Sequence, residues 1–400
     1  MGNDNMDKVR EMLGEIRTMV ADFFSKLQKW SGFDRFRRDK SAYATGRSGI
    51  GKVLYYLRPA VAGFFIIYVA LLFIRFTIIH GDDLEYPQRA MSDEEFVVPP
   101  GTRIPNPQPG GPICEPSQVV AVTAYIIDVL VNQNVWVPGD PQYKIGFGFV
   151  GFAETPWFDN KAHFQTGALR AARRISIELV DLLGRARGTS ASDPDLEDAR
   201  SALQWSERAW IFNPFDDRLQ TISASASQSY RSAKNRLLKY NDRLANCSAV
   251  FDSRGDNLFL LLDRIANDIG GLTDELASRA KGIRWSVEEQ RLVRGEGNNR
   301  WMFDFRADDL FWRAHGMMWA YHGILQAMRI DFGDVVRSAN LTRIWDRMEI
   351  HVAEAASLKP LIVSNGREDS MFMPDHLSIM AANMLRAHAN TQELREVINR

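Results

Sequence analysis

The stretch "RADDLFWRAHGMMWAYHGILQAM", residues 306–328, is apolar on every face of the helix that its spacing predicts. One face carries large apolar residues three and four positions apart. A second face alternates large and small residues, namely Trp312, Gly316, Trp319 and Gly323. A helix that is apolar all round is typical of the centre of a fold. The stretch therefore predicts an all-α protein with residues 306–328 as its central helix.

The same helix carries the candidate ligand site, which consists of Trp312, His315, Trp319 and His322. Its two glycines weaken the helix, so they indicate that a neighbouring helix or a ligand approaches closely. The two histidines lie seven residues apart rather than three or four, which is not typical of a metal site, so we predict no metal and no cofactor. Two interpretations of the four side chains stay open: core packing and a ligand pocket.

Three acidic residues precede or begin this helix, namely Asp304, Asp308 and Asp309. Carboxylates at a helix N-terminus accept hydrogen bonds from the free N–H groups and interact favourably with the helix dipole. We therefore interpret them as capping residues, and we predict no catalytic residue.

The rest of residues 117–400 shows helical spacing almost throughout, which predicts a large helical bundle. We predict a buried first helix over residues 117–133. Residues 136–160 form an irregular loop, which in the ligand-pocket interpretation would line the pocket together with helix 306–328. Two long helices near 222–248 and 256–281 predict an antiparallel hairpin with its turn at "FDSRGDN", residues 251–257. Further helices are expected over 331–357 and 375–389.

Two cysteines, Cys114 and Cys247, lie in this part of the chain. A disulfide between them requires an oxidising compartment outside the cytoplasm. Cys247 also continues an apolar series at helical spacing, which predicts a buried free thiol. The sequence leaves both states open.

An acidic and then proline-rich segment, residues 81–116, precedes the bundle. Eight of the sixteen prolines of the chain lie between residues 84 and 116. Proline excludes a regular helix, so we predict a linker, either extended over roughly 100 Å or packed along the domain.

The segment "PAVAGFFIIYVALLFIRFTII", residues 59–79, predicts a transmembrane helix over residues 59–80. Twenty-one residues at a rise of ~1.5 Å give a helix of roughly 31 Å, which matches the hydrocarbon core of a bilayer. Pro59 is expected at the start of this helix, where its missing N–H does no harm. Lipid is therefore the partner predicted for residues 59–79.

Basic residues dominate the segment before this helix, residues 34–58, and acidic residues dominate the segment after it. Because basic flanks stay on the cytoplasmic side, we expect a bacterial inner-membrane protein with a cytoplasmic N-terminus and a periplasmic C-terminal domain. "GRSGIGKV", residues 46–53, has the glycine and lysine spacing of a phosphate-binding loop. Val53 stands where that loop needs a hydroxyl, so we predict no nucleotide site.

A cytoplasmic amphipathic helix is predicted for residues 1–33. Its apolar face recurs every three or four positions and consists of Val9, Leu13, Ile16, Val20, Phe23, Leu27 and Trp30. Three roles fit this face: self-association, docking on a protein partner, or lying on the membrane. We therefore expect a homo-oligomer or a protein partner.

Composition and motifs narrow the function. The 400 residues carry 49 basic and 50 acidic side chains, and this balance argues against a nucleic-acid partner. The chain has no hydrolase, zinc-protease or dinucleotide-binding motif. These features favour a non-enzymatic scaffold or interaction protein of the cell envelope. The alternative is a periplasmic enzyme or small-molecule-binding protein that uses the Trp/His-lined helix 306–328.

Four stretches resemble a family of uncharacterised bacterial proteins, domain of unknown function 2333. They are "FDNKAHFQTGALRAARRISIELVDLLGRARGTSASDPDLEDA", "AVFDSRGDNLFLLLDRIANDIG", "FDFRADDLFWRAHG" and "MPDHLSIMAANMLRAH", and they cover much of residues 117–390. The resemblance implies a proteobacterial inner-membrane location with one membrane span. It implies no activity, ligand or catalytic residue.

Overall fold

The computed structural model describes residues 49–92, 96, 114–146, 152, 155, 158–185, 191–211, 224–286, 288–294, 304–367, 370–371 and 373–399. The amphipathic helix expected over residues 1–33, with its apolar face, lies outside the described residues. The same holds for residues 97–113, which include most of the proline-rich segment. Both of these expectations remain predictions.

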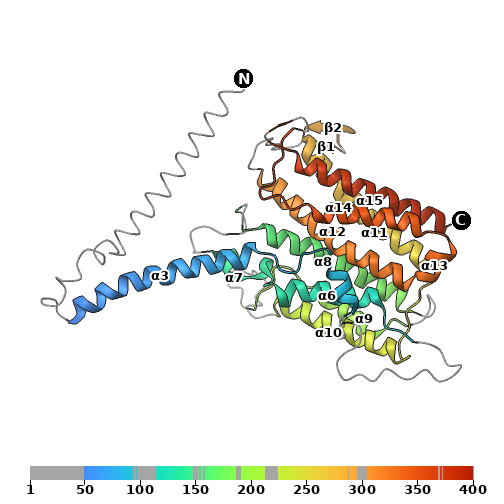
Figure 1. Ribbon diagram of the computed structural model, residues 1–400, viewed down its shortest axis with the longest axis horizontal. Helices are drawn as coiled ribbons and strands as arrows, with labels where there is room; N and C mark the ends of the chain where they lie inside the picture. The colour runs from blue at the N-terminus through green and yellow to red at the C-terminus, as the bar shows by residue number, and fades with distance from the viewer. Residues whose placement is uncertain are drawn as a thin grey trace. The chain divides into compact units, whose positions relative to one another are not determined.

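The described residues divide into two units between Arg75 and Phe76. The all-α fold is confirmed, because helices make up nearly all of the regular structure that is described (Figure 1). The one sheet in these residues is an antiparallel ribbon of β1 (Ile283–Ser286) and β2 (Arg291–Arg294). The second unit starts at Phe76, so residues 81–92, which we expected in a linker, belong to the helical domain.

The apolar segment lies in α3 (Gly49–Thr77). Its part Pro59–Thr77 is long and apolar enough to cross a membrane. Large apolar side chains are exposed along it, with Phe64 at 71% and Ile67 at 61%. Pro59 lies inside the helix rather than at its start, because the helix begins ten residues earlier, at Gly49.

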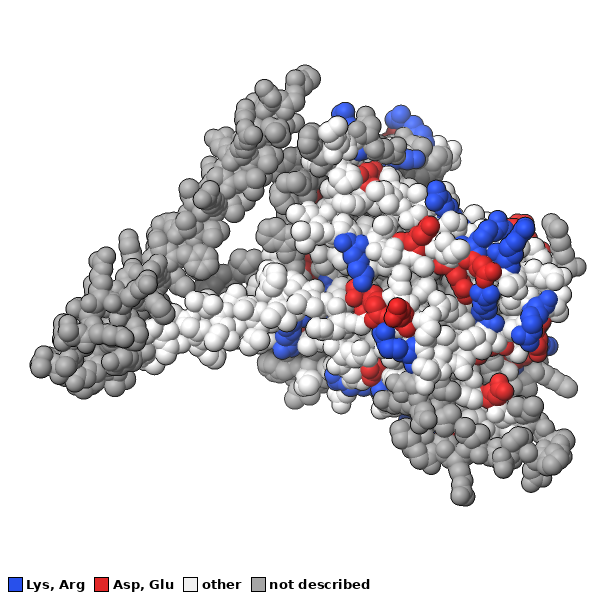
Figure 2. All heavy atoms as spheres, viewed as in Figure 1, with Lys and Arg blue, Asp and Glu red and all other residues white. Residues whose placement is uncertain are grey.

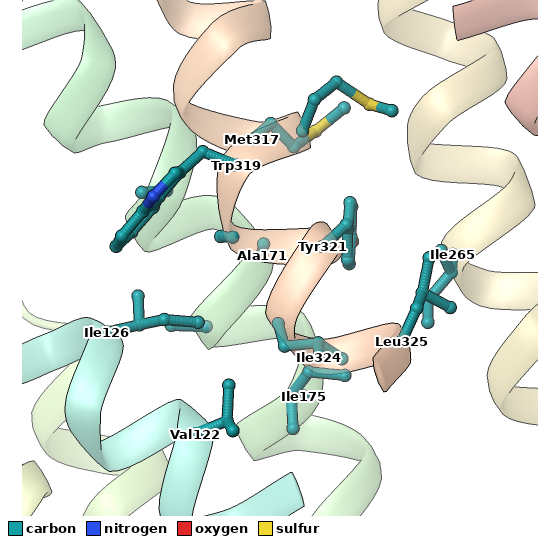
Figure 3. Close-up of a cluster of buried hydrophobic side chains, with 14 of the residues drawn as sticks. Val122, Ile126, Ala171, Ile175, Ile265, Met317, Trp319, Tyr321, Ile324 and Leu325 are labelled. Carbon is teal, nitrogen blue, oxygen red and sulfur yellow. The ribbon is translucent and has the colours of Figure 1, made fainter. Parts of the chain in front are cut away.

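The central helix of the domain is α12 (Phe305–Asp331), as the sequence predicts. It starts at Asp304, whose carboxylate accepts a hydrogen bond from the N–H of Ala307. The helices packed around it include α6 (Gln118–Asp128), α8 (Asn160–Glu178), α11 (Gly255–Lys281) and α14 (Thr342–Ser357). Figure 3 shows the resulting core, in which Ile126 of α6, Ile175 of α8 and Ile265 of α11 lie around the side chains of α12.

Helices α8 and α12 cross at two glycines. A Cβ atom on Gly167 would lie 2.0 Å from the carbonyl oxygen of Arg313, and one on Gly316 would lie 2.0 Å from that of Phe164. Carbon and oxygen atoms cannot approach so closely, so only glycine permits this backbone contact. The close approach that Gly316 predicts is therefore made by a neighbouring helix.

The predicted hairpin of the two long helices is wrong. Helix α10 (Ala226–Ala245) packs on α6 and on α9 (Pro194–Leu203), whereas α11 packs on α15 (His376–Ile398) and on α12. The connection between them is held elsewhere, because the N–H of Asp252 donates to the carbonyl oxygen of Leu183.

The predicted helix over 331–357 is two helices, α13 (Gly333–Ser338) and α14, separated at Asn340, whose φ of 53° lies in the left-handed region. The last helix, α15, continues well beyond residue 389. The other described elements are α4 (Tyr86–Ser92), the 3₁₀ turn Val137–Gly139, α7 (Pro141–Ile145) and two π-helical turns, Val129–Gln133 and Leu179–Leu183.

The two cysteines form a disulfide, Cys114–Cys247. Cys247 lies beyond the end of α10 and is exposed, so of the two states that the sequence leaves open the disulfide is present and the buried free thiol is not. The apolar series of α10 ends at Leu244 because the helix ends at Ala245, and the next residues turn toward solvent. The disulfide therefore joins the start of α6 to the end of α10.

Candidate functional site

The segment that follows the apolar helix is bound to the domain along its whole described length. We call residues 78–92 the juxtamembrane segment. The carbonyl oxygen of Ile78 accepts a hydrogen bond from Lys161 Nζ at 2.8 Å. The backbone of His80 makes two hydrogen bonds with the side-chain amide of Asn134, at 3.0 and 2.8 Å. Lys359 Nζ lies 2.7 Å from the carboxylate of Asp82. Contacts from three separate parts of the domain thus hold this segment.

Tyr86 of α4 is the buried centre of this contact. Its side chain has no exposed surface, and its ring lies against Trp319 with centroids 4.3 Å apart. The hydroxyl donates to the carbonyl oxygen of Trp319 at 2.9 Å and accepts from the N–H of Gly323 at 3.1 Å. A Cβ atom on Gly323 would lie 2.3 Å from this hydroxyl. Gly323 therefore makes room for Tyr86.

Two of the predicted ligand-binding residues contact the juxtamembrane segment. Trp319 Nε1 donates to the carbonyl oxygen of Asp83 at 3.1 Å. His322 Nε2 lies within hydrogen-bond distance of the carbonyl oxygen of Leu84, at 3.1 Å, and of Gln326 at 3.0 Å. The face that we expected to meet a ligand or a helix is thus covered by the chain's own residues at these two positions.

The other two residues of the predicted site lie deeper. His315 is fully buried between the rings of Phe164 and Trp312, with centroid distances of 5.5 and 5.3 Å. Neither ring nitrogen has a hydrogen-bond partner among the described residues. Burial, and to a lesser degree the charge of Lys359, lowers the pKa of His315 to about 3, so the imidazole is neutral at physiological pH. A ligand role for these four residues stays a prediction.

We expect acid to destabilise the domain through His315. In the unfolded chain the imidazole takes up a proton near its usual pKa of 6.5, whereas in the folded state it stays neutral down to about pH 3. Its contribution is therefore fully present above pH 6.5 and is lost as the pH falls from 6.5 toward 3. From this residue alone, the free energy of unfolding should fall by about 3 kcal/mol between pH 7 and pH 4.

Denaturant unfolding of His315→Leu at these two pH values checks this expectation. The variant should lose most of that pH dependence and keep its stability at pH 7, because the two ring nitrogens form no hydrogen bond that leucine would remove. His351→Leu is the matched control, since His351 is partly exposed and paired with Glu354. A stability that falls as steeply between pH 7 and pH 4 in His315→Leu as in the wild type would contradict the assignment.

A second group of polar side chains lies between the N-terminal ends of α8 and α12. It consists of Asp159, His163, Asp308 and Asp309, and Asp159 and Asp308 are nearly completely buried. His163 Nε2 lies 3.2 Å from Asp309 Oδ1. Ligand atoms of Asp159, His163 and Asp309 all lie within 4.8 Å of one another. This is the one set of three or more metal-ligating side chains found within the described ranges of the chain.

Burial and mutual repulsion change the acidity of these carboxyl groups. Burial, followed by the charges of Asp309 and Asp308, raises the pKa of Asp159 well above its usual range. Burial and the charge of Asp309 raise the pKa of Asp308 to about 8. The protonated form of both carboxyl groups is therefore favoured at neutral pH when no cation lies beside them.

Sequence reasoning missed this group. Of the three acidic residues interpreted as capping residues, Asp304 is the cap and pairs with Arg279, and Asp308 lies in the first turn of α12. The local signal is the spacing of Asp159, just before α8, and His163, four residues later in its first turn. Only the packing of α8 on α12 joins the two pairs.

A family model described as "Uncharacterized protein conserved in bacteria (DUF2333)" matches residues 151–400, which is more than half of the chain. The matched range contains α8, α12 and the Asp/His group, whereas the juxtamembrane segment and α6 precede it. No curated protein and no solved structure matches the chain.

Proposed function

The chain belongs to the DUF2333 family of uncharacterised bacterial proteins, and from this premise we propose that it is a non-enzymatic scaffold of the cell envelope. In this proposal Pro59–Thr77 spans the inner membrane, the N-terminus lies in the cytoplasm and the helical domain lies in the periplasm. The domain and the N-terminal amphipathic face offer surfaces for protein partners or for a second copy of the chain.

The exposed apolar surface of α3 carries this proposal. Seven large apolar side chains between residues 61 and 73 are more than 40% exposed: Val61, Phe64, Phe65, Ile66, Ile67, Leu71 and Phe73. Figure 2 shows this helix as an almost uncharged surface. Water does not favour so much contiguous apolar surface, whereas the hydrocarbon of a bilayer does.

Charge and the disulfide support the orientation. Arg47, Lys52 and Arg58 precede the span, and Asp82 and Asp83 follow it. Such an excess of basic residues favours the cytoplasmic side. The Cys114–Cys247 disulfide lies on the other side of the span, where an oxidising compartment would preserve it.

The bound juxtamembrane segment supports a scaffold held at the membrane surface. A flexible linker at this point would let the domain move far from the bilayer. Tyr86 and its partners instead fix the first residues after the span to the domain's central helix. On the visible face of the domain, acidic and basic side chains alternate (Figure 2), which suits protein contacts better than nucleic acid.

Two reporter fusions after Arg400 test the topology. A reporter that is active only after export should be active, one that fluoresces only in the cytoplasm should be dark, and the protein should stay in membranes through carbonate extraction. Activity only in the cytoplasm, or release by carbonate, would contradict the proposed anchor and orientation.

Affinity isolation of the full chain from mild detergent tests the scaffold role. We expect to isolate a specific partner or a homo-oligomer. A variant that lacks residues 1–33 then shows where the contact lies: contacts of the N-terminal apolar face are lost, whereas contacts of the domain are kept. A chain that is monomeric and without a partner at every detergent concentration would overturn the scaffold assignment.

A further inference from the structure

The Asp/His group between α8 and α12 has the composition and the geometry of a metal site. Three side chains bring one imidazole nitrogen and two carboxylate oxygens within 4.8 Å of one another. From this arrangement we propose that Asp159, His163 and Asp309 bind a divalent first-row transition-metal ion, of which Mn²⁺ and Zn²⁺ are the examples to test. This inference does not depend on the proposed membrane topology.

The ligands are held at a fixed spacing by the two helices that carry them. His163 precedes Gly167 by one helical turn, and Asp309 precedes Gly316 by two turns. These glycines form the backbone contact between α8 and α12, where the two helix backbones lie too close together for a Cβ atom on either glycine. A site on two helices locked in this way needs little rearrangement to bind an ion.

Asp309 supplies an unsatisfied acceptor at the centre of the group. Its Oδ1 oxygen is buried and accepts no hydrogen bond from the described residues. The oxygen nevertheless lies 3.2 Å from His163 Nε2. Buried carboxylate oxygens almost always have a hydrogen-bond donor or a cation as a partner. A metal ion bound by both Asp309 Oδ1 and His163 Nε2 would be such a partner.

Asp159 is directed to the same place. It precedes the first residue of α8, but its carboxylate caps no N–H of that helix. The aspartates that precede α9, α12 and α15 do accept such bonds. Asp159 is 2% exposed and lies beside Asp309, so a cation would neutralise two carboxylates that otherwise repel each other.

The donor set selects the class of ion. Calcium and magnesium prefer oxygen ligands alone, whereas imidazole together with carboxylate suits Zn²⁺ and Mn²⁺. His163 is 29% exposed in its side chain and Asp309 36%, which leaves a side open to solvent through which an ion can enter. Water can complete the coordination from that side.

Metal titration of the full chain in detergent micelles tests the proposal. After treatment with a chelator, Mn²⁺ binding is followed by loss of the electron paramagnetic resonance signal of free Mn²⁺, and Zn²⁺ is added as a competitor. We expect one saturable Mn²⁺ ion per chain, displaced by Zn²⁺. His163→Ala and Asp309→Asn should each weaken binding by at least about tenfold.

His351→Ala is the control, because His351 and Glu354 form an exposed pair that belongs to no three-residue ligand set within the described chain. It should bind Mn²⁺ like the wild type. Circular dichroism of each variant verifies the fold. If His163→Ala disturbs the fold, Asp309→Asn still tests the site, because asparagine has nearly the same shape as aspartate. Three results would overturn the proposal: no saturable Mn²⁺ binding, wild-type affinity for Mn²⁺ in both site variants, or Mg²⁺ and Ca²⁺ binding as tight as Mn²⁺ binding and unchanged by His163→Ala.

Discussion

Replacement of Gly316 by alanine is expected to lower the free energy of unfolding of the domain by about 3 kcal/mol. The added methyl group would lie 2.0 Å from the carbonyl oxygen of Phe164 and 2.7 Å from its carbonyl carbon. These are backbone atoms of α8, so no side-chain rotation relieves the overlap. The two helices must separate, and the aromatic and aliphatic side chains around the crossing lose their contacts.

Gly271→Ala is the matched control for this prediction. Gly271 lies in α11, and a Cβ atom there would meet no other atom within 4 Å. Alanine is the better helix former, so this variant should be more stable than the wild type by about 0.5–1 kcal/mol. Denaturant unfolding of both variants in detergent micelles measures the difference. Equal effects at the two positions would show that Gly316 is not at a tight helix crossing.

Loss of the Cys114–Cys247 disulfide should lower the free energy of unfolding of the domain more than Gly316→Ala does. The bond joins residues 133 positions apart and so restricts a large part of the unfolded chain. A loop of this size corresponds to about 4–5 kcal/mol of stability when the restriction is purely entropic. Cys114→Ser/Cys247→Ser is therefore expected to unfold at a much lower denaturant concentration than the oxidised protein.

The reduced wild-type protein provides the control. A reductant should lower the stability of the wild type to that of the double variant, and it should leave the double variant unchanged. The contact between α6 and α10 should loosen first, because the bond joins the start of one to the end of the other. Identical unfolding of the oxidised and reduced wild type would mean that the bond does not stabilise this domain.

Local sequence patterns predicted individual helices well. The bounds expected for the second long helix, 256–281, differ by one residue from those of α11, and Asp304 precedes α12 as expected. A helix is fixed by bonds four residues apart and by the spacing of its apolar face, both of which lie within a short stretch. Asn340 shows the limit of this reasoning, because its left-handed backbone interrupts a pattern that reads as one helix.

Helix pairing was not predictable in the same way. The apolar face of α11, which includes Leu258, Ile265 and Leu276, is buried against α15 and α12 and not against α10. The spacing of these residues indicates which face is buried but not which helix covers it. The alternating tryptophans and glycines of α12 likewise indicated a close neighbour without identifying α8 and Tyr86.

The sequence by itself determined the helical class, the central position of residues 306–328 and the single segment apolar enough to span a membrane. Each of these follows from the spacing and the hydrophobicity of neighbouring residues. The tertiary structure alone decided that the cysteines are bonded, that Tyr86 fills the space beside Gly323, and that Asp159 and His163 meet Asp308 and Asp309. These contacts join residues more than a hundred positions apart, where no local periodicity records which surface meets which.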